Sequence, residues 1–267
     1  MFVYPLKSAL QPTRPRIGDV CQTARWWWVL VAVLVGASTV SAQFFTDTFE
    51  SYSNNAWPTA NWSAQFNAAS APSTNLVVTD PAGGDHALKL TNANNWSAFA
   101  FRQVTLPSTF RFEADVYEPS SNGGIGYQVI DLWSGLGTGS LQRMVSFRNE
   151  TIYVLGDPTG TYASAVSGNF SFDAWHHVTI DYVRGSSATV SFSVDGTFLG
   201  QWSTTGYGGA WDTSYTYLGL GQAQINAYSG YFDNVSVSSI PEPSTFAGLF
   251  GLMVLGFAVY RKRQKPV

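Results

Sequence analysis

The stretch DAWHHVTIDYVRGSSATVSFSVDGTFLG (173–200) decides how this chain folds. Every second residue from Val190 to Val194 is apolar, and the residues between them are serines. An alternation with a period of two and one apolar face indicates an antiparallel strand that is half-buried against a core. Asp195-Gly196 follows at once, and this dipeptide favours a two-residue hairpin turn because both turn positions need a positive φ. The stretch therefore predicts a strand that turns back at Asp195-Gly196 into another strand.

The same alternation recurs along the chain, and helical periodicity is almost absent from 43–240. In TFRFEADVY (109–117), the apolar residues from Phe110 to Val116 share one face, and the polar residues between them share the other. Short alternating runs broken by Gly, Asn, Ser and Pro are the pattern of an all-β sandwich. We predict a single antiparallel β-sandwich domain over 43–239.

Charge is distributed unevenly, and the formal net charge of −3 is an average over regions of opposite sign. Both ends are basic, whereas 43–240 carries 15 acidic and 6 basic residues, a balance of −9. Phosphate binding needs clustered Lys and Arg, so this balance excludes nucleic acid as a partner. The single cysteine, Cys21, lies near the N-terminus, so disulfide and thiol chemistry are not expected in the domain.

Residues 1–42 have the composition of a secretory signal peptide. A basic segment ends at Arg25, and WWWVLVAVLVG (26–36) forms a short apolar core. The small residues of ASTVSA (37–42) then suit cleavage after Ala42. Because the basic segment is long, an uncleaved anchor is the alternative. Either reading predicts export.

The C-terminal stretch IPEPSTFAGLFGLMVLGFAVYRKRQKPV (240–267) combines three features in order. Pro241, Glu242 and Pro243 come first, then an apolar run predicted as a transmembrane helix at about 245–260, then a basic end that stays cytoplasmic by the positive-inside rule. This arrangement closely resembles the PEP-CTERM sorting signal of Gram-negative bacteria that make exopolysaccharide. The resemblance implies that a membrane enzyme, the exosortase, processes the tail. The body would then lie outside the cytoplasm, anchored in the membrane or at the cell surface.

The opening stretch also resembles the central hairpin of laminin-G-like and concanavalin-A-like jelly rolls. WHHV (175–178) stands where that family has Trp-His-x-Val, and VDG (194–196) stands where it has Val-Asp-Gly. DTFESY (47–52) and GYFDNVSVS (230–238) resemble the first and last strands of such domains. The resemblance implies an all-β jelly roll whose terminal strands pair in one sheet.

EADVYE (113–118) fits Glu-x-Asp-x-x-Glu, which resembles the catalytic pattern of a retaining glycoside hydrolase family built on the same fold. The resemblance would make Glu113 the nucleophile, Asp115 its helper and Glu118 the acid/base, with the two outer carboxyls about 5 Å apart. On a regular strand Glu113 and Asp115 share a face, but Glu118 joins them only through a bulge. Pro119 cannot donate to a sheet ladder, so we expect the strand to end before it. The alternative is a polar strand face that ends at a turn.

Two carboxylates are expected on core-facing sides of the terminal strands. Asp233 is predicted to share a face with Val235, and Asp47 to share one with Phe45. An inward carboxylate needs hydrogen bonds or a cation. If the terminal strands pair, Asp47, Glu50 and Asp233 are candidate ligands of a structural calcium ion, and turn capping is the alternative. No other cofactor is predicted.

Aromatic residues are abundant in polar, glycine-rich stretches. Exposed Trp and Tyr side chains can stack on sugar rings, so we take Trp96, Trp133, Trp211 and Tyr215 as carbohydrate-binding candidates. The alternative is that such residues fill the core of a sandwich, since aromatics favour strands.

Together these patterns predict an exported surface or matrix protein with a non-catalytic module that binds extracellular polysaccharide or mediates adhesion. A glycoside hydrolase that uses Glu113 and Glu118 is the first alternative. A purely structural matrix protein without a defined ligand is the second.

Overall fold

The structure is a computed structural model of the chain. It describes residues 43–66, 76–91, 98–123, 127–133, 141–156, 162–184, 189–203, 216–223, 228–240 and 251–257. The chain divides into two compact units, Met1–Val40 and Ser41–Val267, and all described residues belong to the second. The predicted signal peptide and the Pro-Glu-Pro motif lie outside the described residues.

Residues 251–257 form a short helix inside the predicted transmembrane run. Within the described ranges, no helix has the length and apolar character needed to cross a membrane. The prediction of a spanning helix at 245–260 is therefore not supported by the part of the run that the structure describes, and the rest of the run lies outside it.

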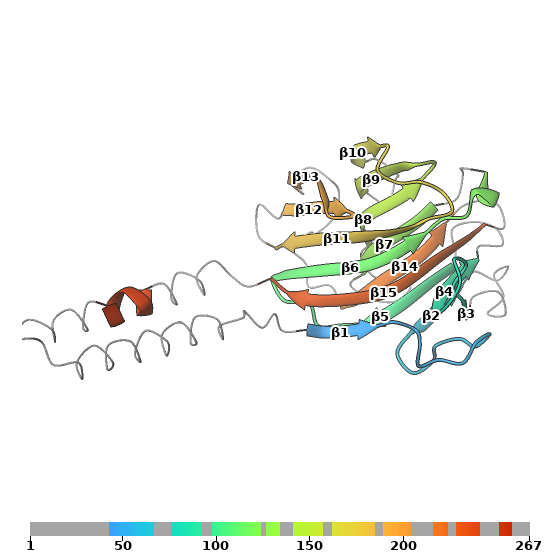
Figure 1. Cartoon of the computed structure of the whole chain (residues 1–267), viewed down its shortest axis with the longest axis horizontal. Coiled ribbons are helices and arrows are strands. Elements are labelled where there is room, and N and C mark those ends of the chain that lie inside the picture. The colour runs from blue at the N-terminus through green and yellow to red at the C-terminus, as the bar shows by residue number, and fades with distance from the viewer. Residues whose placement is uncertain are drawn as a thin grey trace, which may run out of the picture. The chain divides into compact units, whose positions relative to one another are not determined.

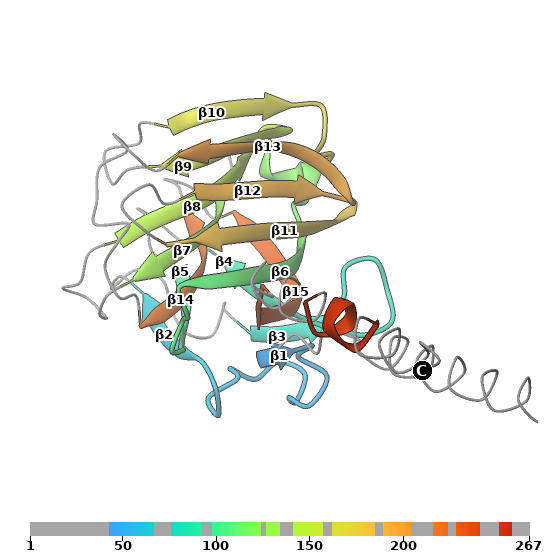
Figure 2. The ribbon, with the colours of Figure 1, turned by 90° about the vertical axis from the view of Figure 1, so that its left-hand side faces the viewer.

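The described strands form two antiparallel sheets (Figures 1 and 2). The first sheet has the order β13-β12-β11-β6-β15-β4-β3, with β1 paired to β15. The second has the order β10-β9-β8-β7-β14-β5-β2. The first-sheet strands are β1 (Gln43–Asp47), β3 (Leu76–Thr79), β4 (His86–Thr91), β6 (Thr109–Tyr117), β11 (Trp175–Val183), β12 (Thr189–Val194), β13 (Thr197–Ser203) and β15 (Ser229–Ser239). The second-sheet strands are β2 (Ser63–Phe66), β5 (Ala98–Gln103), β7 (Tyr127–Trp133), β8 (Leu141–Arg148), β9 (Thr151–Gly156), β10 (Tyr162–Ser167) and β14 (Tyr217–Ala223).

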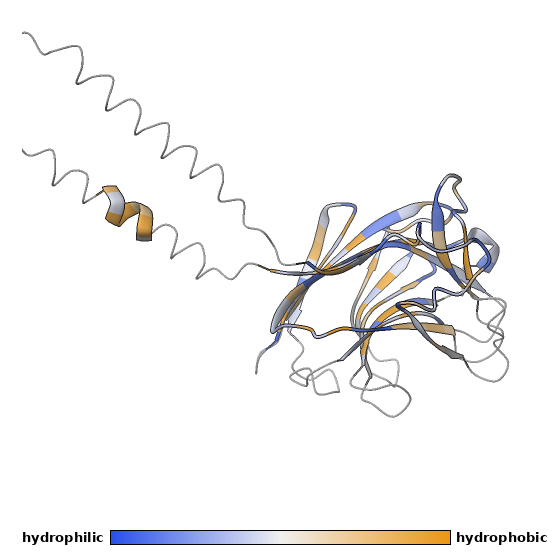
Figure 3. Cartoon of the chain, turned by 90° about the horizontal axis from the view of Figure 1, so that it is seen from below, coloured by the Kyte–Doolittle hydropathy of each residue, from blue (hydrophilic) through white to orange (hydrophobic). Residues whose placement is uncertain are grey.

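The core lies between the two sheets, which Figure 3 shows as separate layers. Phe112 and Val237 of the first sheet and Ile130 and Leu220 of the second belong to one cluster of fully buried apolar residues. Burying each such side chain stabilises the fold by about 1.5–3 kcal/mol. The all-β sandwich predicted from alternation is confirmed, because buried apolar residues alternate with more exposed polar ones along β6 and β12 of the first sheet.

The central hairpin is confirmed in detail. β11 pairs with β12, and β12 pairs with β13 through the register Val194 to Thr197. Asp195 has a φ of 50° and Gly196 a φ of 73°, so both turn residues adopt the left-handed conformation that a two-residue hairpin requires.

The terminal strands pair as expected, since β1 lies antiparallel to β15. The expected position of the first strand at 47–52 is wrong, because β1 ends at Asp47. There the Phe49 amide donates to Asp47 Oδ1 at 3.0 Å, and Phe49 has a φ of 56°, which turns the chain out of the strand.

Candidate active site

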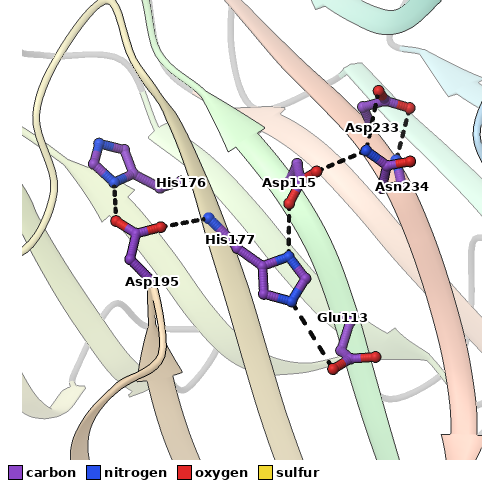
Figure 4. A network of polar contacts seen from close by, with 7 residues as sticks. All are labelled: Glu113, Asp115, His176, His177, Asp195, Asp233 and Asn234. Atoms are coloured by element: carbon purple, nitrogen blue, oxygen red, sulfur yellow. Dashed lines mark hydrogen bonds and ion pairs between the residues drawn. The ribbon is translucent and has the colours of Figure 1, made fainter.

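The face of the first sheet that points away from the core, here called the outer face, carries a cluster of acids and amides (Figure 4). On β6, Glu113 and Asp115 lie on this face, because they alternate along the strand with Phe112 and Ala114, which are buried in the core. β11 runs alongside, and its register sets His177 directly opposite Asp115. Side chains at opposed positions on neighbouring strands share a face and touch, so this pairing brings the imidazole to the acids.

His177 lies between the two carboxylates of β6. Its Nδ1 is 2.7 Å from Asp115 Oδ1, and its Nε2 is 3.9 Å from Glu113 Oε1. A carboxylate only accepts, so Nδ1–H is the donor to Asp115. The side chains of Asp115, Glu113 and His177 are 24%, 33% and 46% exposed, so a ligand on the outer face can reach all three.

A bulge in β15 completes the cluster. Asp233 pairs with Asp115, but the next paired residue, Ser236, lies opposite Glu113, so β15 holds one extra residue there. Asn234 carries this irregularity with a φ of 48°. Its side-chain amide Nδ2 donates to Asp115 Oδ2 at 2.7 Å and lies 3.4 Å from Asp233 Oδ2. The bulge is the reason that Asp233 faces outward while Val235 returns to the core, and the prediction of an inward Asp233 is wrong.

Asp233 is the acid of this cluster with the most unusual electrostatics. Its pKa is raised to about 7, mainly by burial and to a smaller degree by the negative charges of nearby acids such as Asp115, against a lowering by the Asn234 backbone amide. That amide donates to Asp233 Oδ1 at 2.6 Å. A carboxyl that holds its proton near neutral pH can act as a general acid.

Aromatic side chains form a row beside the acids on the same face. Trp175 and Tyr231 both lie opposite Tyr117, on β11, β15 and β6 respectively. The Tyr117 ring centroid is 5.4 Å from that of Trp175 and 5.7 Å from that of Tyr231. Lys89 of β4 extends the row, with Nζ 5.9 Å from the Tyr231 ring. Tyr117 is buried, whereas Trp175 and Tyr231 are half-buried, so these two rings offer apolar surface next to the carboxylates for the C–H faces of sugars.

Glu118 does not join this cluster. Tyr117 lies on the outer face, so the following residue turns to the opposite side, where Glu118 is fully buried. Burial raises the pKa of Glu118 to about 8, against a smaller lowering by the Asn122 amide. β6 ends at Tyr117, before Pro119, as expected, and no bulge in β6 carries Glu118 to the outer face. The predicted pairing of Glu113 with Glu118 is therefore wrong, and the cause is strand alternation.

The predicted calcium ligands serve separate contacts. Asp47 accepts hydrogen bonds from Tyr52 Oη at 2.9 Å, Trp62 Nε1 at 2.8 Å and Arg102 Nη1 at 3.1 Å. Glu50 Oε1 accepts the backbone amide of His86 at 2.7 Å. Asp233 points to the outer face. Across the described ranges, no three His, Cys, Asp or Glu side chains gather as metal ligands, so Asp47, Glu50 and Asp233 do not form the predicted calcium site.

Only one of the four carbohydrate-binding candidates, Trp133, lies within the described residues. The other three, Trp96, Trp211 and Tyr215, lie outside them. Trp133 packs edge-on against Phe101 and Phe99, with ring centroids 5.1 and 6.0 Å away. These rings form a second apolar cluster apart from the core, so Trp133 lies on the far side of the second sheet from the acids on β6.

The site also contains residues that sequence reasoning did not connect with the acids. Asn234 and the row of Tyr117, Trp175 and Tyr231 come together through the pairing of β6 with β11 and β15. The alternation around Tyr117 and Tyr231 gave a partial signal of their face. The sequence contains no signal of the register between β6 and β15, because these strands are far apart along the chain.

The fold with these features is a concanavalin-like jelly roll, and solved structures of that class match it. The endo-1,3-beta-glucanase of Streptomyces sioyaensis is 12% identical, covers 76% of this chain and 98% of its own, and has a TM-score of 0.52. A mixed-linkage glucan GH16 protein of Bacteroides ovatus with bound product is 12% identical, covers 72% and 99%, and has a TM-score of 0.54. The alginate lyase Aly36B, as a variant with bound alginate trisaccharide, is 14% identical, covers 76% and 100%, and has a TM-score of 0.52.

No family model and no curated protein matches the chain. At such low identity, the structural likeness establishes the fold, and the jelly roll inferred from the central hairpin is confirmed. The predicted non-catalytic function is contradicted by the same neighbours, since they are named as a glucanase, a GH16 protein and an alginate lyase. The glycoside hydrolase alternative is better supported than the non-catalytic prediction.

Proposed function

We propose that this protein is a glycan-active enzyme, a retaining glycoside hydrolase whose catalytic acids are Asp115 and Asp233 on the outer face of the first sheet. The observation that carries the proposal is the Asn234 side-chain amide, which lies within 3.4 Å of both carboxylates. Structural neighbours that are named for action on glucans and alginate support a polysaccharide as the substrate class.

The separation of the two acids supports the retaining class. Asn234 Nδ2 is 2.7 Å from Asp115 Oδ2 and 3.4 Å from Asp233 Oδ2, so these oxygens cannot be farther apart than the sum of the two distances. That limit is below the roughly 6.5 Å at which the spacing of inverting enzymes begins, and it is compatible with the spacing of about 5 Å in retaining enzymes. Inverting enzymes need the larger gap because a water molecule lies between the general base and the sugar.

The raised pKa of Asp233 gives the two acids different roles. Asp233, whose pKa burial raises to about 7, donates its proton to the glycosidic oxygen as the bond to the anomeric carbon breaks. Asp115 attacks the anomeric carbon and forms a glycosyl ester. Asp233 then removes a proton from water, which hydrolyses the ester and regenerates both acids.

The neighbouring residues prepare Asp115 for this step. His177 and Asn234 donate to its two oxygens at 2.7 Å each, which fixes the orientation of the carboxylate. Glu113 lies 3.9 Å from the other imidazole nitrogen, so it acts on Asp115 through His177 as a positioning residue. The row of Tyr117, Trp175 and Tyr231 lies two residues along the strands from Asp115, His177 and Asp233, where it provides a surface for the sugar rings of the substrate.

The charge of the site favours a neutral polysaccharide over a polyuronate. An alginate lyase is the second candidate, because one neighbour of this fold is an alginate lyase. A polyuronate brings a carboxylate on every sugar, and here it would meet the carboxylates of Glu113 and Asp115 on one face. Like charges at such distances repel, so we favour hydrolysis of a neutral glycan.

The test is an assay of the full chain on β-1,3-glucan, mixed-linkage β-glucan and alginate. New reducing ends without unsaturated product are expected on a neutral glucan, and Asp115→Asn and Asp233→Asn should each lower the rate by about 10²–10⁴-fold. Asp181→Asn is the matched control, since Asp181 lies on the same face but binds Arg111 at 2.7 Å. Unsaturated product from alginate, or equal activity of all three variants, would reject the proposal.

We also propose, from the sequence, that the enzyme is exported and sorted by an exosortase. The signal peptide at 1–42 and the Pro241-Glu242-Pro243 motif before an apolar run and a basic end support this location. In the native host, replacement of all three motif residues by alanine should leave the protein in the membrane fraction with its tail uncleaved. Identical fractionation and mass of the two proteins would refute sorting through this motif.

A further inference from the structure

A second constellation lies at the start of β11, separate from the acids on β6. Ser171, in the segment that precedes β11, has its Oγ 3.1 Å from His176 Nε2. His176 Nδ1 is 2.7 Å from Asp195 Oδ2 (Figure 4). A serine is activated as a nucleophile when a histidine lies within hydrogen-bond reach of its hydroxyl and a carboxylate orients that histidine.

The tautomer of His176 suits a general base. The backbone amide of Ser171 donates to Nε2 at 3.1 Å, and an amide can only donate, so Nε2 is unprotonated. The ring proton is then on Nδ1, where it is donated to Asp195. Once Nε2 has taken a proton, it can donate a hydrogen bond to the Ser171 carbonyl oxygen, which lies 3.2 Å away. The ring can therefore hold a proton between steps.

Asp195 is fixed in place by the hairpin turn. Its Oδ1 accepts the backbone amide of His177 at 2.8 Å, and its own amide donates to the His177 carbonyl at 2.8 Å. The imidazole of His176 also packs against Phe170, with ring centroids 4.8 Å apart, and the residue is 8% exposed. Rigid support of the base by a carboxylate and an aromatic ring keeps Nε2 directed at Ser171.

The three residues border one open pocket of about 410 Å³. Ser171 is exposed, so a substrate in this pocket can reach its hydroxyl. Asn169 borders the same pocket, and its side-chain amide is a donor for a developing oxyanion. Glu150 also borders it and disfavours an anionic substrate. The pocket therefore favours a neutral ester over an anionic one.

We propose that Ser171, His176 and Asp195 form an esterase site that removes acyl groups from neutral alcohols, such as acyl groups on sugar hydroxyls. Ser171 Oγ attacks the ester carbonyl carbon while its proton passes to His176 Nε2. The bond from that carbon to the alcohol oxygen breaks, and Nε2 returns the proton to this oxygen. Water then attacks the acyl-Ser171, again through Nε2, and releases the carboxylic acid and free Ser171. No cofactor is needed, and the site does not rest on the proposed glycosidase.

The experiment treats the full chain with a fluorophosphonate probe, which labels activated serines, and with p-nitrophenyl acetate. Peptide mass spectrometry should locate the phosphonate on Ser171, and Ser171→Ala should lose both the label and ester hydrolysis. Asp195→Asn, which tolerates the positive φ of this turn, should lower hydrolysis by about 10²–10⁴-fold. Ser167→Ala is the matched control, because Ser167 is also exposed but pairs with Thr151 at 3.1 Å.

The outcomes separate this site from the proposed glycosidase. Ser171→Ala is expected to leave glycan hydrolysis unchanged, while Asp115→Asn leaves labelling of Ser171 unchanged. Absence of label on Ser171 in a chain whose circular dichroism matches the folded protein would overturn the proposal. Equal ester hydrolysis by wild type and Ser171→Ala would overturn it as well.

Discussion

Replacement of Glu118 by glutamine should remove a large part of the pH dependence of folding. Burial raises the pKa of Glu118 from 4.5 to about 8. Below pH 4.5 both folded and unfolded chains hold this proton, so its stabilising effect is fully present there. As the pH rises towards 8, the unfolded chain has released the proton but the folded chain has not, and stability is lost through this range. Above pH 8 the loss is complete.

The size of the effect follows from the shift. Each pKa unit corresponds to about 1.36 kcal/mol, so a rise from 4.5 to about 8 sets an upper limit of roughly 5 kcal/mol on the loss. Between about pH 5 and pH 8 the wild-type chain should lose roughly 3 kcal/mol more than Glu118→Gln. Asp233, whose pKa is also raised, contributes equally to both proteins and cancels in the comparison.

The measurement is urea unfolding of the full chain followed by tryptophan fluorescence. With a slope of about 1–3 kcal/mol per molar urea, the midpoint of the wild type should fall by about 1 M or more relative to the variant. Asp85→Asn is the control, because Asp85 is exposed and should leave the pH dependence unchanged. Parallel pH curves for wild type and Glu118→Gln would refute the burial of this carboxyl.

Three further predictions concern the buried carboxylate of Asp47, the hairpin turn at Gly196 and the proton donor Asp233. Asp47→Asn should destabilise the fold by about 3 kcal/mol, because Asp47 accepts from Tyr52, Trp62 and Arg102, and an unchanged unfolding midpoint would contradict this role. Gly196→Ala should cost about 1 kcal/mol, since its φ of 73° is unfavourable for alanine, and urea unfolding with no change would argue against the turn. Glycan hydrolysis should fall about tenfold per pH unit above 7, because Asp233 with a pKa of about 7 loses the proton it donates, and a rate that stays flat to about pH 9 would exclude it as the acid.

Much of the fold could be predicted from the sequence because it depends on local patterns. Apolar alternation from Val190 to Val194 and the Asp195-Gly196 turn specify a hairpin through the two neighbouring strands alone. The resemblance of 230–238 to a last strand also anticipated the pairing of β15 with β1. These features need only the period of the side chains and the conformational freedom of the turn residues.

The catalytic face could be predicted only in part, because it depends on one bulge. The alternation placed Glu113 and Asp115 together, and the structure agrees. For Asp233 the same rule failed, because the extra residue at Asn234 puts Asp233 on the face opposite to the one that alternation from Val235 predicts. Glu118 shows the converse: without a bulge in β6, alternation sends it inward. A single inserted residue is not visible in a pattern of period two when two adjacent residues, here Asp233 and Asn234, are both polar.

The most direct test of the catalytic account is to trap the glycosyl ester on the full chain with a 2-fluoro aryl glycoside of a neutral sugar. Such a substrate forms the ester faster than water hydrolyses it. Intact mass and peptide mapping should find one glycosyl group, on Asp115, and its formation should slow in Asp233→Asn. A glycan-hydrolysing chain that forms no adduct, or that carries it on Glu113 or Glu118, would contradict the assignment of Asp115 and Asp233.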